Sequence, residues 1–91
     1  MKLLFSRHAL EKMRKRKISV EEVKKTVSSG ETIKEYHHDK PFPSRLVLGF
    51  PGGRPLHVVL AEDSEGVKYV ITVYEPDPSL WEDGFRRRKK T

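Results

Sequence analysis

The sequence predicts an α+β domain in which two N-terminal helices pack on one face of a four-stranded antiparallel sheet. Two observations lead to this prediction. Apolar residues recur at helical spacing up to Gly30 and at alternate positions after it, and glycine and proline then divide the chain into strands and turns. The 91 residues leave room for one small domain, because a chain of this size buries only about 60–65% of its unfolded surface.

Two serines mark the expected helix starts. Ser6 precedes the run RHALEKMRKRK, which contains good helix formers and no glycine or proline. Ser19 precedes a second helical run with Glu22 three positions later, the spacing of a capping box. Gly30 follows the last apolar position and is expected to end this helix. The helix pair therefore occupies the first third of the chain.

Four stretches with strand character follow. They are residues 31–38, 44–50, 54–62 and 67–75. The first is polar and charged, as expected of an edge strand. The segment Pro51-Gly52-Gly53 predicts a tight hairpin between the second and third, and Asp63 to Gly66 predicts a turn between the third and fourth.

These turns predict a register. If Phe50 pairs with Arg54, and Glu62 pairs with Val67, one face of the sheet is apolar and takes the helices. That face carries Leu46, Leu48, Phe50, Leu56, Val58, Leu60, Tyr69, Ile71 and Val73. The opposite face carries Arg45, Val47, Gly49, His57, Val59, Val70, Thr72 and Tyr74. In this register His57 lies beside Thr72, with Tyr74 one step along.

Charge is high and uneven. Charged residues make up 35% of the chain and the net charge is +6, concentrated in the runs KMRKRK and RRRKK. The uneven positive charge favours a polyanionic partner such as RNA. The alternative is that this charge only keeps the protein soluble and belongs to a disordered tail. We expect residues 1–81 to form one domain and residues 82–91 a basic, flexible C-terminal tail, with Trp81 and Phe85 pinning the segment after Pro78 to the domain.

Composition also bears on location. The chain has no cysteine, which excludes disulfides and thiolate zinc sites. No apolar run is long enough for a membrane span or a signal peptide, so we expect a cytoplasmic protein with no membrane partner. Asparagine and glutamine are absent while charged residues abound, a composition typical of thermophiles.

The stretches FSRHALEKMRKRKIS, GGRPLHVV and VITVYEPD resemble a small bacterial and archaeal family, domain-of-unknown-function family 4258. The resemblance runs from Phe5 to about Trp81. It implies a RelE-like, barnase/RelE-type architecture and a toxin-antitoxin setting, with a zinc-finger antitoxin similar to MqsA (YgiT) as partner. RNA cleavage is implied by kinship with RelE-type toxins. The chain departs from the family pattern at Lys17, where glycine is frequent.

Metal-independent RNA cleavage needs a base for the ribose 2′-hydroxyl, a cation for the phosphorane and an acid for the leaving oxygen. Histidine and arginine suit these roles. The candidate catalytic residues are His8, Arg16, His57, Thr72 and Tyr74. His8 and Arg16 are added by the resemblance. Each has a structural alternative: a capping or surface histidine for His8, a solvated basic face for Arg16, a satisfied half-buried ring for His57, and an ordinary strand residue for Tyr74.

Further arginines are candidates for contacts with RNA phosphates. They are Arg14, Arg45, Arg54, Arg86, Arg87 and Arg88. The pair His37-His38 suggests no metal site, because neighbouring residues of a strand point to opposite faces. We expect no cofactor.

Three functions fit these features. The first is a toxin-antitoxin toxin acting as a small metal-independent ribonuclease on mRNA. The second is a non-catalytic RNA-binding module on the same face. The third is an interaction domain whose uncovered sheet face or strand edge binds an acidic antitoxin segment.

Overall fold

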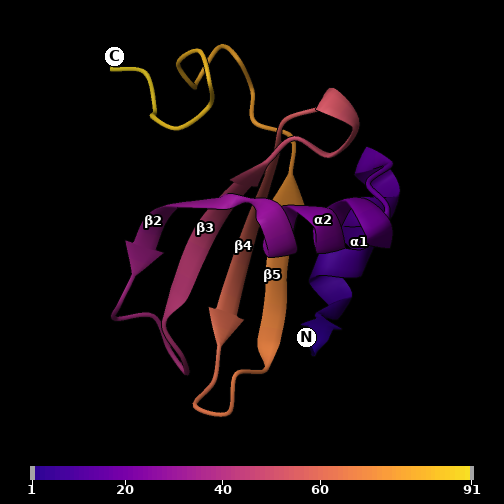
Figure 1. Cartoon of the computed structure of the whole chain (residues 1–91), viewed down its shortest axis with the longest axis vertical. Helices are drawn as coiled ribbons and strands as arrows, with labels where there is room; N and C mark the ends of the chain where they lie inside the picture. Colours follow the sequence, from indigo (N-terminus) through magenta and orange to yellow (C-terminus); the bar gives the residue numbers. More distant parts are fainter. Residues whose placement is uncertain (1, 91) are drawn as a thin grey trace.

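The protein is described by a computed structural model that covers residues 2–90, and it has the expected α+β architecture (Figure 1). The elements are β1 (Leu3–Phe5), α1 (Arg7–Arg16), α2 (Val20–Ser29), β2 (Glu31–Tyr36), β3 (Ser44–Gly49), the 3-10 turn η1 (Pro51–Gly53), β4 (Leu56–Glu62) and β5 (Lys68–Tyr74). Both helices lie over one face of the sheet (Figure 1). Among residues 2–90, no helix has the length and apolar character needed to cross a membrane.

Both predicted helix starts are confirmed. The Ser6 hydroxyl accepts a hydrogen bond from the Ala9 amide, and Ser19 and Glu22 form the complete capping box. The second helix ends at Ser29 as expected, but Gly30 is extended (φ −80°) rather than left-handed. Glycine is needed here for close approach, since a Cβ would lie 2.3 Å from the Thr26 carbonyl oxygen and 2.5 Å from that of Leu48.

The sheet has five strands in the order β1-β5-β4-β3-β2, and β1 runs parallel to β5. The expectation of four antiparallel strands was therefore wrong in the number of strands and in the purely antiparallel pairing. The missed strand is only three residues long, and its partner, which begins at Lys68, lies at the far end of the chain. A short apolar run before a helix cap carries no periodic signal of its own.

The predicted register of the first hairpin was wrong by one residue. Gly49 pairs with Leu56, and Leu48 pairs with His57. In the predicted register Gly49 would have faced Pro55, which has no amide hydrogen to give to the ladder. The strand begins after this proline, and the loop becomes longer than the three residues expected.

The second predicted pairing was also wrong, because Glu62 pairs with Lys68 rather than with Val67, and a bulge in β5 then shifts the remaining pairs by one more residue. The paired residues pass from Leu60 and Val70 to Val59 and Thr72, which leaves Ile71 unpaired. Consequently Val70 and Val73 both face the helices. The helix-covered core contains Ala9, Met13, Ile18, Val23, Val47, Leu56, Val58, Leu60, Val70 and Val73.

The two predicted faces are thus partly exchanged. Residues directly opposite in neighbouring strands share a face, so Leu46 and Leu48 lie with Val59 and His57 on the side away from the helices. Val47 and Val70, expected on that side, belong to the helix-covered core. Phe50, Ile71 and Leu80 are among the exposed large apolar residues. We call the side away from the helices the open face.

Residues 77–90, which we call the strap, fold over one end of the open face. Trp81 and Arg88 form a β-bridge, and the amide of Lys89 donates to the Leu80 carbonyl. The turn of the strap has positive φ at Gly84 (88°) and Phe85 (60°). The strap lies where β2 begins and where β3 and β5 end (Figure 1). The Trp81 ring packs against His57 as expected, whereas Phe85 contacts His57 through its backbone carbonyl.

Candidate RNA-binding site on the open face

His57 lies on the open face near the start of β4, under the strap, and is fully buried, with 0% of its surface exposed. Its Nε2 lies 2.9 Å from the Phe85 carbonyl oxygen, and its Nδ1 lies 3.2 Å from the Tyr74 hydroxyl. A carbonyl oxygen can only accept, so Nε2 carries the hydrogen, and in the neutral ring Nδ1 accepts from Tyr74. Both ring nitrogens are therefore satisfied inside the protein.

Two aromatic rings hold this imidazole. Trp81 and Tyr74 both meet the His57 ring edge-to-face, with centroids 4.5 and 5.2 Å away. Burial lowers the pKa of His57 below its ordinary value of 6.5, and the hydrogen bond to the Phe85 carbonyl offsets part of this effect. Burial likewise raises the pKa of the Tyr74 hydroxyl, which stays protonated at neutral pH. The pair is therefore neutral.

A pocket of about 320 Å³ lies beside this pair, and we call it the strap pocket. Its lining comes from β2, β3, β5 and the strap, and consists of Ile33, Lys34, Tyr36, Leu46, Tyr74, Trp81, Arg86 and Arg88. Three aromatic rings and three cations thus surround one cavity. A bulge in β2 at Ile33 helps to build it, because Lys34 then pairs with Leu46 and Tyr36 with Ser44.

The cations of the strap pocket rest on its rings. The Lys34 ammonium lies 5.4 Å from the centre of the Tyr36 ring, and the Arg88 guanidinium lies 5.7 Å from that of Trp81. Arg86 is paired with Glu31 through its Nε and a terminal nitrogen, each 2.9 Å from the same carboxylate oxygen. Aromatic rings beside cations suit a base and its phosphate.

The structure brings three of the five expected catalytic residues onto the open face. His57 is directly opposite Tyr74, and Thr72 lies two pairs further along on the same face, opposite Val59. His8 and Arg16 lie instead on α1, which packs on the other side of the sheet. His8 is exposed, and Arg16 donates to the Val73 carbonyl at 2.6 Å. Arg16 thus satisfies the backbone at the outer edge of β5.

The six arginines expected to contact RNA divide into different groups. Arg86 and Arg88 line the strap pocket, and Arg87 is exposed on the strap. Arg14 is exposed on α1. The remaining two, Arg45 and Arg54, are held in ion pairs away from the open face.

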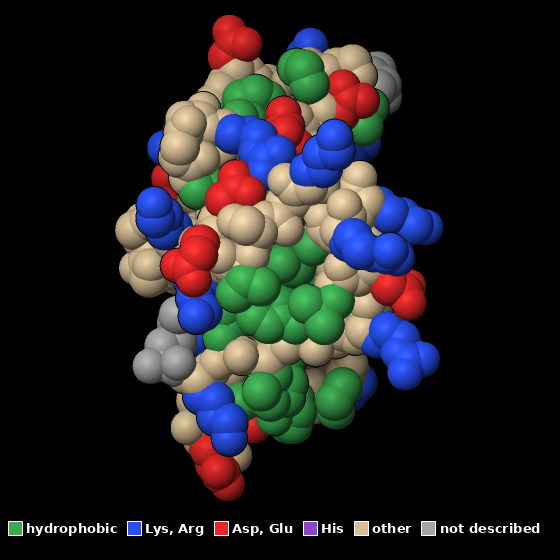
Figure 2. All heavy atoms as spheres, turned by 90° about the vertical axis from the view of Figure 1, so that its right-hand side faces the viewer, with side chains coloured by type: hydrophobic (Ala, Val, Ile, Leu, Met, Phe, Trp, Pro, Cys, Tyr) green, Lys and Arg blue, Asp and Glu red, His purple; other side chains and the backbone are tan. Residues whose placement is uncertain are grey.

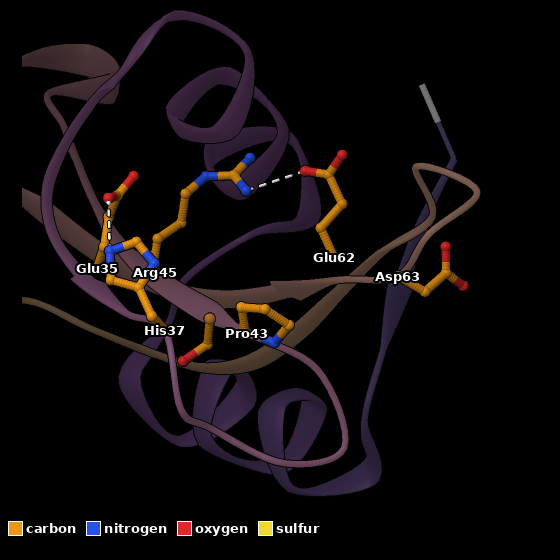
Figure 3. A pocket seen from close by; sticks show the side chains of 7 residues that line it. Glu35, His37, Pro43, Arg45, Glu62 and Asp63 are labelled. Carbon is orange, nitrogen blue, oxygen red and sulfur yellow. Dashed lines mark hydrogen bonds and ion pairs between the residues drawn. The ribbon is translucent and has the colours of Figure 1, made fainter.

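Arg54 and Arg45 both have carboxylate partners. Arg54 donates to Glu22 at 2.7 Å and to the Lys17 carbonyl at 3.3 Å, which ties the β3–β4 loop to the start of α2. Arg45 donates to Glu62 at 2.9 Å in a second pocket of about 300 Å³, which also holds the pair His37–Glu35 (Figure 3). The charges in this second pocket are largely paired with one another. Within residues 2–90, no group of three or more His, Cys, Asp or Glu side chains could hold a metal ion.

Sequence reasoning did not select Lys34, Tyr36 or Trp81 as binding residues. Lys34 and Tyr36 alternate along a strand that was recognised as polar, and their spacing of two places them on one face. Lys34 and Tyr36 could therefore have been predicted from the sequence. The position of Trp81 in the pocket could not, because it depends on the fold of the strap.

The architecture defines the chain as a small α+β domain with one helix-covered sheet face. Residues 5–75 match the family described as "Domain of unknown function (DUF4258)", and the chain belongs to this family. The match begins at the last residue of β1, includes both helices and strands β2 to β5, and ends just before the strap. Comparison with curated proteins gave no match, and neither did comparison with solved structures.

Proposed function

We propose that the protein binds single-stranded RNA in the strap pocket. The observation that supports this proposal is the gathering of Tyr36, Tyr74 and Trp81 with Lys34, Arg86 and Arg88 around one cavity. Proteins that bind single strands combine a cationic groove with rings on which bases stack. The net charge of +6 adds long-range attraction for a polyanion.

Stacking provides the test. Replacing Tyr36 by leucine removes one ring from the pocket, and stacking on a ring is worth about 1–3 kcal/mol per base, which corresponds to a roughly 5- to 150-fold loss of affinity. Tyr69→Leu is the matched control, because Tyr69 lies on β5 beside Phe42, outside the strap pocket. Fluorescence anisotropy with a labelled oligonucleotide measures both. Equal affinities in wild type and Tyr36→Leu would contradict the proposal.

Cleavage of the bound RNA, as in a toxin-antitoxin toxin of RelE-like type, is a second candidate function. It is favoured by the position of Tyr74, which lines the strap pocket and at the same time donates to His57. A histidine can exchange a proton near neutral pH and a phenol can donate to a phosphate oxygen. Such a role belongs in the cytoplasm, where mRNA is found.

An RNA cleavage assay in chelator tests this second function. Wild type should cut the substrate, and both His57→Ala and Tyr74→Phe should cut it far more slowly. Circular dichroism must show that each variant is folded. Undiminished cleavage in two folded variants would remove these side chains from the chemistry.

A protein partner, such as an antitoxin, would need a second surface. Viewed from the right-hand side of Figure 1, hydrophobic side chains gather in the middle and lower part of the molecule, with Lys and Arg around them (Figure 2). Leu4 and Ile71 are 43% and 40% exposed, and a pocket of about 450 Å³ is lined by Phe42, Tyr69 and Ile71 among others. We propose the surface around this pocket, where Leu4 pairs with the lining residue Tyr69, for an acidic antitoxin segment with apolar anchors. Ile71→Asp should weaken capture of a co-expressed antitoxin while RNA binding is retained.

A further inference from the structure

The contacts of the strap with the sheet point to a cover that can open. We infer that residues 77–90 form an autoinhibitory cover over His57, that the Glu31–Arg86 ion pair latches it, and that phosphate groups release the latch by competing with Glu31 for Arg86. This inference concerns the access of RNA to His57 in the proposed cleavage, and it rests on that proposed function for its biological meaning. Its physical content, the opening of the strap, can be tested without RNA.

The cover blocks His57 directly. The Phe85 carbonyl accepts the Nε2 hydrogen, and the Trp81 ring packs edge-to-face with the imidazole, which is fully buried. Tyr74 occupies the other nitrogen. While the strap is closed, His57 has no free nitrogen to offer a substrate. Moving the strap would free Nε2 and leave the bond with Tyr74 in place, because both partners belong to the sheet.

The latch is a weak contact at an exposed position. The side chains of Arg86 and Glu31 are 55% and 54% exposed, so water and salt compete with their interaction. Glu31 is the first residue of β2 and is fixed by pairing with Leu48, whereas Arg86 belongs to the strap. The pair therefore joins a moving part to a fixed one.

The backbone of the closed strap is strained. Phe85 has φ of 60°, a conformation that a residue with a side chain seldom adopts. It is the same residue whose carbonyl accepts from His57. Opening would relax this residue, so the closed form depends on its few contacts with the sheet.

Phosphate is the ligand class that fits the latch. An arginine fork binds carboxylate and phosphate through the same pair of parallel hydrogen bonds. The strap also carries Arg87, Arg88, Lys89 and Lys90 directly after Arg86. A polyanion that contacts these residues would draw Arg86 away from the single charge of Glu31.

The chemical reactivity of each histidine measures whether the strap shields His57 from solvent. Diethyl pyrocarbonate acylates a ring nitrogen of accessible neutral imidazoles, and mass spectrometry of peptides follows each histidine separately. The exposed His8, His37 and His38 are internal references in the same chain. In wild type, His57 should react at least about tenfold more slowly than these. A His57 rate equal to theirs would overturn the cover.

The latch is tested by the variant Glu31→Gln, with Glu35→Gln as its control. The control removes the same charge from the same strand, but its residue is paired with His37 rather than with the strap. Glu31→Gln should raise the His57 rate about two- to fivefold, as expected for the loss of one exposed ion pair. Glu35→Gln should leave it unchanged. Equal rates in both variants and wild type would refute the latch.

Inorganic tripolyphosphate tests the ligand class. It should raise the His57 rate in wild type more than sodium chloride of the same ionic strength, and should have no such excess effect in Glu31→Gln. Identical effects of the two salts would refute competition by phosphate. Because no RNA is used, failure here is separate from failure of RNA binding, which anisotropy measures.

Discussion

The hydroxyl of Tyr74 satisfies a buried nitrogen, and its removal should be costly. Tyr74→Phe keeps the ring against His57 but deletes the donor to Nδ1, which lies 3.2 Å away. The imidazole is fully buried, so Nδ1 is left without a partner. Leaving a buried acceptor unsatisfied costs about 1–3 kcal/mol, and the long distance places this bond in the lower half of that range.

We therefore expect Tyr74→Phe to lower the free energy of unfolding by about 1–2 kcal/mol, or the Tm by roughly 4–16 °C for a domain of this size. Urea unfolding followed by circular dichroism gives the free energy. Tyr69→Phe is the control on the same strand, because its acceptor is the Asp63 carboxylate at 2.9 Å, which water can reach. The control should lose less. Equal losses in the two variants, or none in Tyr74→Phe, would refute the assigned tautomer and the closed His57 site.

Two further predictions concern stability. Burial lowers the pKa of His57 from 6.5, so near this pH the folded state binds fewer protons than the unfolded state. The stability that neutral His57 contributes should therefore be complete above about pH 6.5 and should be lost as the pH falls below this value. Urea titrations at a series of pH values measure the free energy of unfolding, and His57→Gln should flatten its dependence on pH between pH 7 and 5. An unchanged dependence in this variant would show that another group is responsible. Lys17, directly after α1, has a left-handed backbone with φ of 56°. Lys17→Gly should therefore raise the free energy of unfolding by about 1 kcal/mol, whereas Lys17→Ala should leave it unchanged.

Local signals in the sequence were reliable where local physics decides the structure. Ser6 and Ser19 are followed by helices because their side chains cap backbone amides within the next three residues. Nothing beyond the segment is needed for that. Lys17 follows the first helix with a left-handed backbone (φ 56°), a conformation that favours glycine.

Sheet pairing was predicted less well, because a single residue can change the register and thereby which alternate residues of a strand face the helices. Pro55 delays the start of β4, the turn before β5 places Lys68 rather than Val67 opposite Glu62, and the bulge at Ile71 then shifts the helix-facing side of β5 by one position. The shift moved Val47 and Val70 into the helix-covered core. His57, Thr72 and Tyr74 kept their common face, so this part of the candidate site was predictable.

The strap pocket could not be predicted from alternation alone. Half of its charged and aromatic lining comes from Trp81, Arg86 and Arg88, whose positions follow from contacts with His57 and Glu31 across the chain. A run of arginines after a glycine gives no sign of such contacts. The flexibility expected of residues 82–91 stays a prediction, which the reactivity of His57 addresses.

The most direct test of RNA binding in the strap pocket is the salt dependence of affinity. For single strands, the slope of log K against log salt changes by about 0.7 for each phosphate contact. The double variant Lys34→Gln, Arg88→Gln removes two pocket cations and should reduce the slope by about 1.4, while Arg7→Gln, Arg14→Gln on α1 should leave it nearly unchanged. If the α1 variant loses as much slope as the pocket variant, RNA is attracted by net charge alone and the strap pocket is not its binding site.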